Sequence, residues 1–361
     1  MIILVLMLLI VGIYWLYWLA KAQRMDRMTS SLPGPPALPL LGNGMLFIGD
    51  TQSIAVNNKG CAKIWLGPKL YVAIGHPEDA QVVLENCLDK DVVYRFLRPW
   101  LGHGLFVAPV GLWKTHRKVL LPVFHNKIVE KYLGVIADQS DVLLERLREQ
   151  TDKAEFDVLR YVTACTLDIV FETAMGERMD IQHSPETPYL RARHTVMEIL
   201  NMRLFKVWLQ PDCLFNLTRY AKQQKDNIDL THKFTDEIEF TDEQLREHID
   251  SITIAGNDTT ALVIAYTLED LLQMHYLERV IKESMRLYTV VPIIARNIER
   301  DTHLRKFLVL SQCCLPAKLN TDNGCLAVVR TYKLQADDIG PLKIEMLLFP
   351  IRGHQIKVAL R

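Results

Sequence analysis

The hydrophobic and polar positions of the chain follow a helical period over most of its length. Apolar residues recur every three or four positions from Val142 to Leu147, and the same spacing continues from Phe156 to Met175. Two short apolar runs between Lys63 and Ile74, separated by a Gly-Pro turn, predict a pair of strands, and Pro77 begins a helix through Leu84. The pattern therefore predicts a mainly α fold with a small β-sheet.

Residues 1–20 contain neither a charged residue nor proline. A helix of about 20 apolar residues spans the hydrocarbon core of a bilayer. Aromatic rings crowd the end of this segment and basic residues begin at Lys21, which by the positive-inside rule places the rest of the chain in the cytosol. A cleaved signal peptide is the alternative, because Ala20 and Ala22 form a small-x-small site, but its basic leading segment is absent. We predict a single-pass transmembrane anchor over residues 1–20.

Residues 21–40 are basic at first and then rich in proline. The prolines between Leu32 and Leu40 bar helix formation and predict a stiff, extended hinge between the anchor and a domain over residues 41–361. A linker without any further role is equally compatible with the composition.

Composition excludes some classes of function. Lys and Arg number 42 and Asp and Glu also number 42, so no global field favours nucleic acid as a partner. The seven cysteines are an odd number without a CxxC pair, which indicates reduced thiols rather than a disulfide framework.

A long helical segment from Thr241 to Thr267 carries an unusual motif in its middle. Residues Ala255 to Thr260 place a glycine and two hydroxyl side chains inside the helix, where each lowers helix propensity. A broken local rule often marks a functional site. A solvated or mildly kinked helix face is the alternative interpretation.

Two further pairs have helical spacing. Glu283 and Arg286 stand three apart on an amphipathic helix that ends before Pro292, and such a pair is most often a surface ion pair. Trp113 and Arg117 stand four apart, so both project from one helical face and could hold a carboxylate or phosphate group.

Histidines near that second pair offer no metal site. His116 and His125 lack a companion at ligand spacing, so we interpret both as ordinary polar or packing residues.

In this order the segments resemble the cytochrome P450 family of haem-thiolate monooxygenases, and within it the animal microsomal group that includes the fatty-acid ω-hydroxylases. Trp113 with Arg117 is similar to the family's haem-propionate-binding helix, and Ala255 to Thr260 to its central-helix motif. Glu283 with Arg286 resembles its Glu-x-x-Arg helix. The resemblance implies the family's mainly α fold with a small β-sheet, here incomplete, behind an N-terminal transmembrane helix.

The resemblance also implies cofactors, partners and roles. Haem b would be held by a cysteine thiolate, and NADPH-cytochrome reductase would supply electrons, with cytochrome b5 as an additional partner. One oxygen atom would enter a lipophilic substrate: a fatty acid, a hormone or a xenobiotic. The place implied is the endoplasmic reticulum membrane, with the catalytic domain in the cytosol. The implied residues are Asp258 and Thr259 as catalytic groups, Trp113, Arg117, Ala255, Gly256 and Arg296 around the cofactor, and Glu283 and Arg286 as structural groups.

The chain departs from the family at the metal ligand. No segment of the form Phe-x-x-Gly-x-Arg-x-Cys-x-Gly exists, so no axial ligand can be assigned, and Cys325 is only the least unsuitable of Cys313, Cys314 and Cys325. Internal junctions are shortened as well, as from Ala265 to Asp270, which predicts a truncated catalytic domain with low stability and weak haem retention. The alternative is a non-catalytic, haem-deficient, membrane-anchored relic or a faulty gene model.

Two further expectations come from the resemblance. Ala255 stands where many ω-hydroxylases carry a glutamate bonded covalently to haem, so that bond is not expected here. The segments Thr331–Leu334 and Leu348–Leu360 resemble the family's C-terminal strands.

Overall fold

The chain, seen in a computed structural model, divides into two compact units. Unit 1 consists of Met1–Asp91, Phe205–Trp208 and Ala295–Leu315, and unit 2 of Val92–Leu204, Leu209–Ile294 and Pro316–Arg361. The structure describes residues 12, 13, 16, 19, 20, 23, 29, 30, 32–38, 42, 43, 61–67, 69–74, 77–184, 187–236, 243–270, 281, 283–285, 287, 288, 290, 291, 294–297, 302, 303, 308, 309, 313–315, 332–335, 342–344, 346–350 and 352–360.

The strands of unit 1 form a four-stranded sheet with the order β1-β2-β7-β4. β1 (Cys61–Leu66) and β2 (Lys69–Ile74) pair antiparallel, which confirms the predicted strand pair. Gly67 has a φ of +59°, a conformation that glycine adopts without steric cost in a tight turn. β7 (Cys313–Leu315) runs parallel to β2, and β4 (Ile294–Arg296) completes the sheet.

A helix and a hairpin accompany this sheet. α3 (Pro77–Asn86) begins at the predicted proline, and its Val83 has no exposed surface. β5 (Thr302–His303) and β6 (Leu308–Val309) pair antiparallel.

The described part of the proline-rich segment, residues 32–38, is hydrogen-bonded to the sheet. The Lys63 amide donates to the Pro33 carbonyl (2.8 Å), and Leu32 is buried. The Asn43 side chain donates to the Pro36 carbonyl (3.0 Å) and accepts from the Trp65 amide (2.8 Å). Residues 32–38 are therefore part of unit 1, and the hinge predicted over residues 21–40 stays a prediction.

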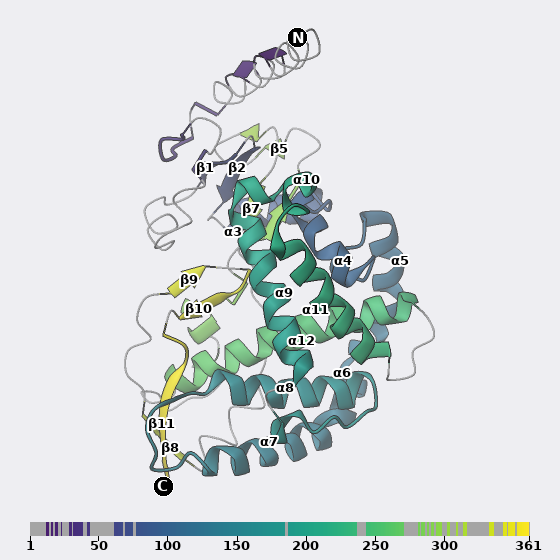
Figure 1. The fold of residues 1–361 in the computed structure, drawn as a ribbon, viewed down its shortest axis with the longest axis vertical. Helices are drawn as coiled ribbons and strands as arrows, with labels where there is room; N and C mark the ends of the chain where they lie inside the picture. Colours follow the sequence, from purple (N-terminus) through teal and green to yellow (C-terminus); the bar gives the residue numbers. More distant parts are fainter. Residues whose placement is uncertain are drawn as a thin grey trace. The chain divides into compact units, whose positions relative to one another are not determined.

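Helices follow one another through most of the remaining described chain, which confirms the mainly α fold (Figure 1). The α-helices are α4 (Arg98–Leu101), α5 (Val110–Leu120), α6 (Asn126–Val129), α7 (Leu133–Arg148), α8 (Leu159–Ala174), α9 (Pro188–Phe205), α10 (Asp212–Phe215), α11 (Arg219–Asp236) and α12 (Glu243–Asp270). Short 3-10 helices connect them: η2 (Val92–Leu97), η3 (Leu121–Phe124), η4 (Glu130–Tyr132), η5 (Ile181–His183) and η6 (Val207–Leu209).

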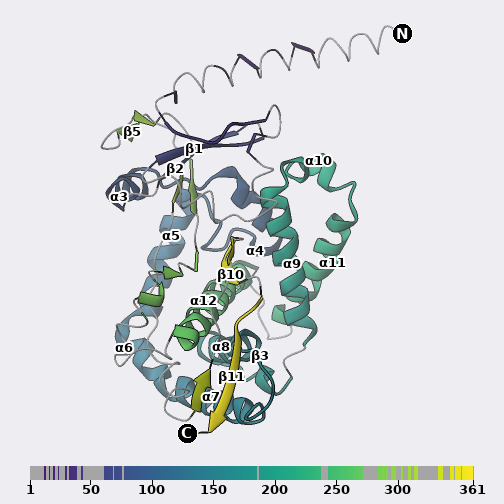
Figure 2. The same ribbon diagram turned by 90° about the vertical axis from the view of Figure 1, so that its left-hand side faces the viewer.

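The core of unit 2 lies around α12, which packs along α8. In Figure 2, α12 lies between α5 and α6 on one side and α9 and α11 on the other. Ala261 and Ala265 stand one turn apart with no exposed surface, and such small side chains let two helices approach closely. The buried cluster here contains Leu143, Leu147, Phe156, Val158, Val162, Cys165, Ala261, Ile264, Ala265, Leu268, Ile356 and Val358.

The C-terminal strands are present as predicted. β11 (Gln355–Leu360) lies between β3 (Phe156–Asp157) and β8 (Tyr332–Gln335) in an antiparallel sheet, and β9 (Leu342–Ile344) pairs with β10 (Leu348–Pro350). Because Phe156 and Asp157 pair with β11, the expectation of an uninterrupted helix from residue 156 is wrong, and α8 begins only at Leu159.

The segment after α4 packs closely on α12. Gly102 has a φ of +51°, and a Cβ atom at Gly102 or Gly104 would collide with Glu247 or Ser251 of α12. The Leu105 amide donates to His248 Nδ1 (3.2 Å). Two glycines thus allow the backbone contact that holds this segment against the helix.

Several predictions fall on positions outside the described residues. Among the residues that are described, no helix combines the length and apolar character needed to cross a bilayer. Most of the predicted anchor, residues 1–20, lies outside them, so the anchor stays a prediction. Thr241, Arg286, Pro292 and Cys325 lie outside them as well.

Candidate functional site

The unusual motif lies in the middle of α12 and does not interrupt the helix. The Thr259 hydroxyl donates to the Ala255 carbonyl (2.5 Å), so it is satisfied within its own helix. Asn257 has no exposed surface, and the interpretation as a solvated helix face is therefore wrong at this position. Ala255 is exposed and Gly256 half-buried, which leaves the backbone of α12 accessible at the two positions expected near a cofactor.

Asp258 forms a buried ion pair that the sequence did not reveal. Arg193 of α9 donates to its carboxylate, and the side chains are 5% and 18% exposed. Burial raises the pKa of Asp258, while the positive charges of Arg193 and His194 oppose the rise. The predicted proton-relay acid is therefore held by a cation from another helix.

Asn257 joins the same network through α8. Its amide nitrogen, turned to face a hydrogen-bond acceptor, donates to Thr166 Oγ1 (2.5 Å) and to the Thr163 carbonyl (3.1 Å). Its oxygen then lies 2.6 and 2.7 Å from the two terminal nitrogens of Arg193. Side chains from α8, α9 and α12 thus satisfy one another in the core.

Trp113 and Arg117 lie on one face of α5, as their spacing predicts. The Arg117 guanidinium stacks over the Trp113 ring at 5.1 Å from its centroid, and Arg117 is exposed. None of the residues from Val110 to Tyr132 is buried. The pair is positioned to bind an anionic group, on a segment whose apolar residues are largely exposed.

Both histidines of this region have ordinary roles. The His116 ring contacts the His248 ring of α12 edge-on, with centroids 4.4 Å apart, and His125 Nδ1 accepts from the Lys127 amide at the start of α6 (3.4 Å). Among the described residues no cluster of three or more His, Cys, Asp or Glu side chains could hold a metal ion.

Arg296 belongs to unit 1, unlike the other predicted cofactor residues. Lys90 pairs with it across a β-bridge, and burial together with the charge of Arg296 lowers the pKa of Lys90 to about 8. Two adjacent cations favour an anionic partner. Glu283 is half-buried, and its predicted pairing with Arg286 is not tested because Arg286 lies outside the described residues.

The environment of each described cysteine determines whether it could bind haem iron as a thiolate. Cys87 is buried, and Cys213 is exposed on α10. The Cys165 thiol donates to the Gln139 carbonyl (3.5 Å), and burial raises its pKa to about 12, so it is not a thiolate at neutral pH. The described side chains therefore suit the propionates of a haem, through Trp113 and Arg117, but supply no axial thiolate.

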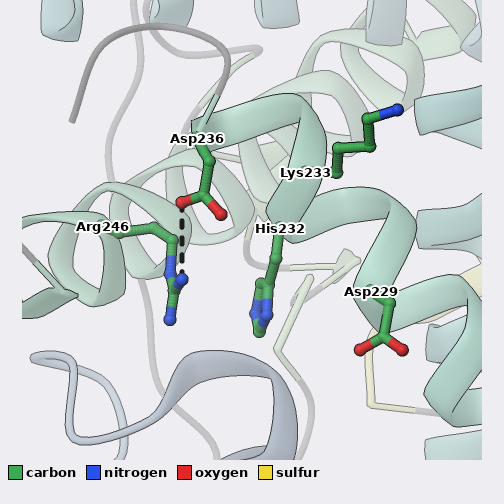
Figure 3. Close-up of a pocket in the computed structure, with 5 residues that line it drawn as sticks. All are labelled: Asp229, His232, Lys233, Asp236 and Arg246. Carbon is green, nitrogen blue, oxygen red and sulfur yellow. Dashed lines mark hydrogen bonds and ion pairs between the residues drawn. The ribbon is translucent and has the colours of Figure 1, made fainter. Parts of the chain in front are cut away.

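A cavity of about 470 Å³ lies between α11 and the first turns of α12 (Figure 3). It is lined by Asp229, His232, Lys233, Asp236 and Arg246. Arg246 pairs with Asp236 (3.4 Å), and His232 Nε2 contacts the Trp100 carbonyl (2.7 Å). No local signal in the sequence indicated this cavity, because it forms only when two helices pack.

Residues 32–238 and 266–311, together more than half of the chain, match the family model described as Cytochrome P450. This chain belongs to the cytochrome P450 family. The predicted resemblance is thereby confirmed, and members of this family are oxidoreductases that act as haem-dependent monooxygenases.

Relatives within the cytochrome P450 family cover most of the chain. Cytochrome P450 4V2 of Homo sapiens is 26% identical over an alignment of 386 positions that covers 83% of this chain and 71% of the relative. Cytochrome P450 4c3 of Drosophila melanogaster is 28% identical over an alignment of 395 positions that covers 84% of this chain and 72% of the relative. A crystal structure of a mutant cytochrome P450DA heme domain superimposes with a TM-score of 0.75 at 17% identity, covering 91% of this chain and 98% of that one, and shows the shared fold.

Proposed function

We propose that this chain is a haem-dependent monooxygenase that inserts one oxygen atom into a lipophilic substrate such as a fatty acid, a hormone or a xenobiotic. The observation that supports it most directly is the acid and alcohol, Asp258 and Thr259, side by side in the middle of α12. Such a pair can hold and pass a proton to a reacting group. Electrons would come from NADPH through a reductase, with cytochrome b5 as a second donor.

Some of the chain's own residues would bind the cofactor, and others would hold the proton. Trp113 and Arg117 would bind the propionates by charge-assisted hydrogen bonds. Thr259 Oγ1 carries a proton that it now shares with the Ala255 carbonyl. A haem whose iron is held by a cysteine thiolate supplies the electron density that favours cleavage of the O–O bond.

The anchor and the cellular site belong to the same proposal. Residues 1–20 would hold the protein in the endoplasmic reticulum membrane with the catalytic domain in the cytosol, where a lipophilic substrate partitions from the bilayer.

The axial thiolate is the part of the site that the described side chains do not supply. Under this proposal it comes from Cys313, Cys314 or Cys325, which lie where the chain departs from the family pattern. A second candidate, a non-catalytic and haem-deficient scaffold, is favoured by one observation: no residue from Val110 to Tyr132 is buried.

A carbon monoxide difference spectrum of the reduced, membrane-expressed protein tests the proposal, because the Soret position reports the axial ligand. A thiolate-type band that one of Cys313→Ser, Cys314→Ser or Cys325→Ser abolishes would support it. Cys213→Ser is the matched control, since Cys213 is exposed on α10 and should leave the band unchanged. No haem signal, or a band without thiolate character, would overturn the monooxygenase and leave the non-catalytic scaffold.

A further inference from the structure

We infer that the cavity between α11 and the first turns of α12 binds a small zwitterion, a chain-like molecule with an amine at one end and an acid group at the other. The cavity has a volume of about 470 Å³, and small-molecule sites typically measure about 300–1,000 Å³. This cavity suits a polar molecule and not a lipophilic substrate, so it is distinct from the site of the proposed function. Every described residue that lines it is charged or titratable: Asp229, His232, Lys233, Asp236 and Arg246.

Charges of both signs line the cavity and balance each other. Among the described residues, the lining carries the carboxylates of Asp229 and Asp236 and the cations of Lys233 and Arg246. A ligand with one net charge would be attracted by one pair and repelled by the other, whereas a zwitterion can place each end against the opposite sign. In Figure 3 the His232 ring lies between the Arg246 guanidinium and the Asp229 carboxylate, which are therefore the two ends of the site.

The spacing along α11 sets the length of the ligand. Asp229 and Asp236 are seven residues apart, which in a helix is nearly two turns and about 10 Å of axial rise. Arg246 lies at the Asp236 end, because the two side chains pair (3.4 Å), and a guanidinium has enough N–H donors to serve a second carboxylate as well. The amine and the acid of the ligand are therefore separated by several bonds, unlike those of an α-amino acid, which share one carbon.

The ring between the two ends is held from the buried side. His232 Nε2 lies 2.7 Å from the Trp100 carbonyl, which can only accept, so this nitrogen carries a hydrogen and donates it. The buried carboxylate of Asp250 lies 3.8 Å from the same nitrogen, and within the described chain its Oδ2 atom has no hydrogen-bond partner. His232 is thus fixed before a ligand arrives, which lowers the entropy that binding must offset.

Ligand-observed NMR titrations of the full-length protein in nonionic micelles test the inference with three probes. The probe δ-aminovalerate carries both charges, whereas valerate keeps only the acid and pentylamine only the amine. We expect δ-aminovalerate to bind at least about tenfold more tightly than either, because each truncated probe loses one charge-assisted contact. Similar affinities for δ-aminovalerate and valerate would make the cavity a site for simple anions, similar affinities for δ-aminovalerate and pentylamine a site for simple cations, and either result would overturn the inference, as would the absence of binding.

Variants assign each end of the probe to a residue. Asp229→Asn should weaken δ-aminovalerate about tenfold without weakening valerate, and Arg246→Gln should weaken it about tenfold without weakening pentylamine. Asp226→Asn is the matched control, because Asp226 is an exposed aspartate one turn before Asp229 on α11 and does not line the cavity. An equal loss in Asp226→Asn, or no loss in Asp229→Asn and Arg246→Gln, would contradict the assignment.

The comparison of the three probes uses the unaltered chain, so it decides the matter even where a variant does not fold. None of these titrations needs haem. A carbon monoxide spectrum without a thiolate band would therefore overturn the proposed function and leave the zwitterion site unaffected, and the reverse result would be equally separate.

Discussion

The segment from α5 to η4 and the helix α8 differ in what covers their apolar side chains. Val119 and Phe124 in the first are 69% and 53% exposed, whereas Leu167 and Phe171 of α8 have no exposed surface. Helices in proteins are stabilised mainly by packing of an apolar face. The described residues therefore bury the apolar side chains around α12, but they leave those of α5, the helix that bears Trp113 and Arg117, largely uncovered. Burial of the apolar face of α5 thus depends on a partner beyond the described residues.

The largest expected effect is the difference in stability lost when one phenylalanine of each region is truncated, Phe171 of α8 and Phe124 of η3. Phe171 packs against Tyr189 and Phe234, with ring centroids 5.9 and 5.8 Å away, and Phe171→Ala should lower the free energy of unfolding by about 3–5 kcal/mol. Phe124→Ala, the same substitution on the exposed segment, should change it by about 0.5 kcal/mol or less. Urea denaturation of both variants measures the difference, and equal losses would mean that Phe124 is covered in solution.

A pH dependence of similar size should come from Asp250, which is 3% exposed on α12. The pKa of Asp250 is raised to about 7, and burial is the largest cause. The hydrogen bond from Thr235 and the positive charge of Arg246 act in the opposite direction and lower this pKa. His232 Nε2 lies 3.8 Å from its carboxylate, and the negative charges of Asp236 and Glu247 raise the pKa further.

The raised pKa of Asp250 determines whether stability rises or falls with pH. Because the folded pKa is raised, the folded state binds the proton more tightly, so the stability is fully present below the unfolded pKa of about 3.9 and is lost as the pH rises toward 7. The loss across this window is at most about 4 kcal/mol. Asp250→Asn should flatten the curve of unfolding free energy against pH between 4 and about 8, and an unchanged slope would assign the dependence to other groups.

A smaller effect is expected at Asp168, which is 1% exposed on α8. Its two carboxylate oxygens accept from the amides of Ile181 and Gln182, each at 2.9 Å, and so hold η5 to the core. Asp168→Ala leaves these buried donors unsatisfied and should cost about 1–3 kcal/mol. The exposed Asp138 of α7 provides the comparison, because Asp138→Ala should be nearly neutral in the same denaturation experiment.

The sequence predicted what depends on local spacing. The strands around the Gly-Pro turn, the helix α3, the pair on α5 and the C-terminal strands follow from periods of two or three to four residues, which a chain segment carries by itself. Arg193 and Asp258 are 65 positions apart, and they meet only because α9 packs on α12. One signal was present: an arginine between Tyr189 and Val196 on an apolar stripe requires a buried anion, although the sequence does not say which.

The smallest effect on stability, and the sharpest test of the opening contrast, is expected from Arg117. Its guanidinium is exposed and stacks on Trp113, an interaction worth about 0.5–1 kcal/mol at the surface. Arg117→Gln should therefore leave the denaturation curve almost unchanged while weakening haem binding in titrations of the membrane-expressed protein, because a propionate loses its charged partner. Exposed Arg148 at the end of α7 is the control, since Arg148→Gln should alter neither. A large loss of stability in Arg117→Gln would show that contacts within the protein hold α5 in place. The apolar side chains of the segment would then not need a cofactor to cover them.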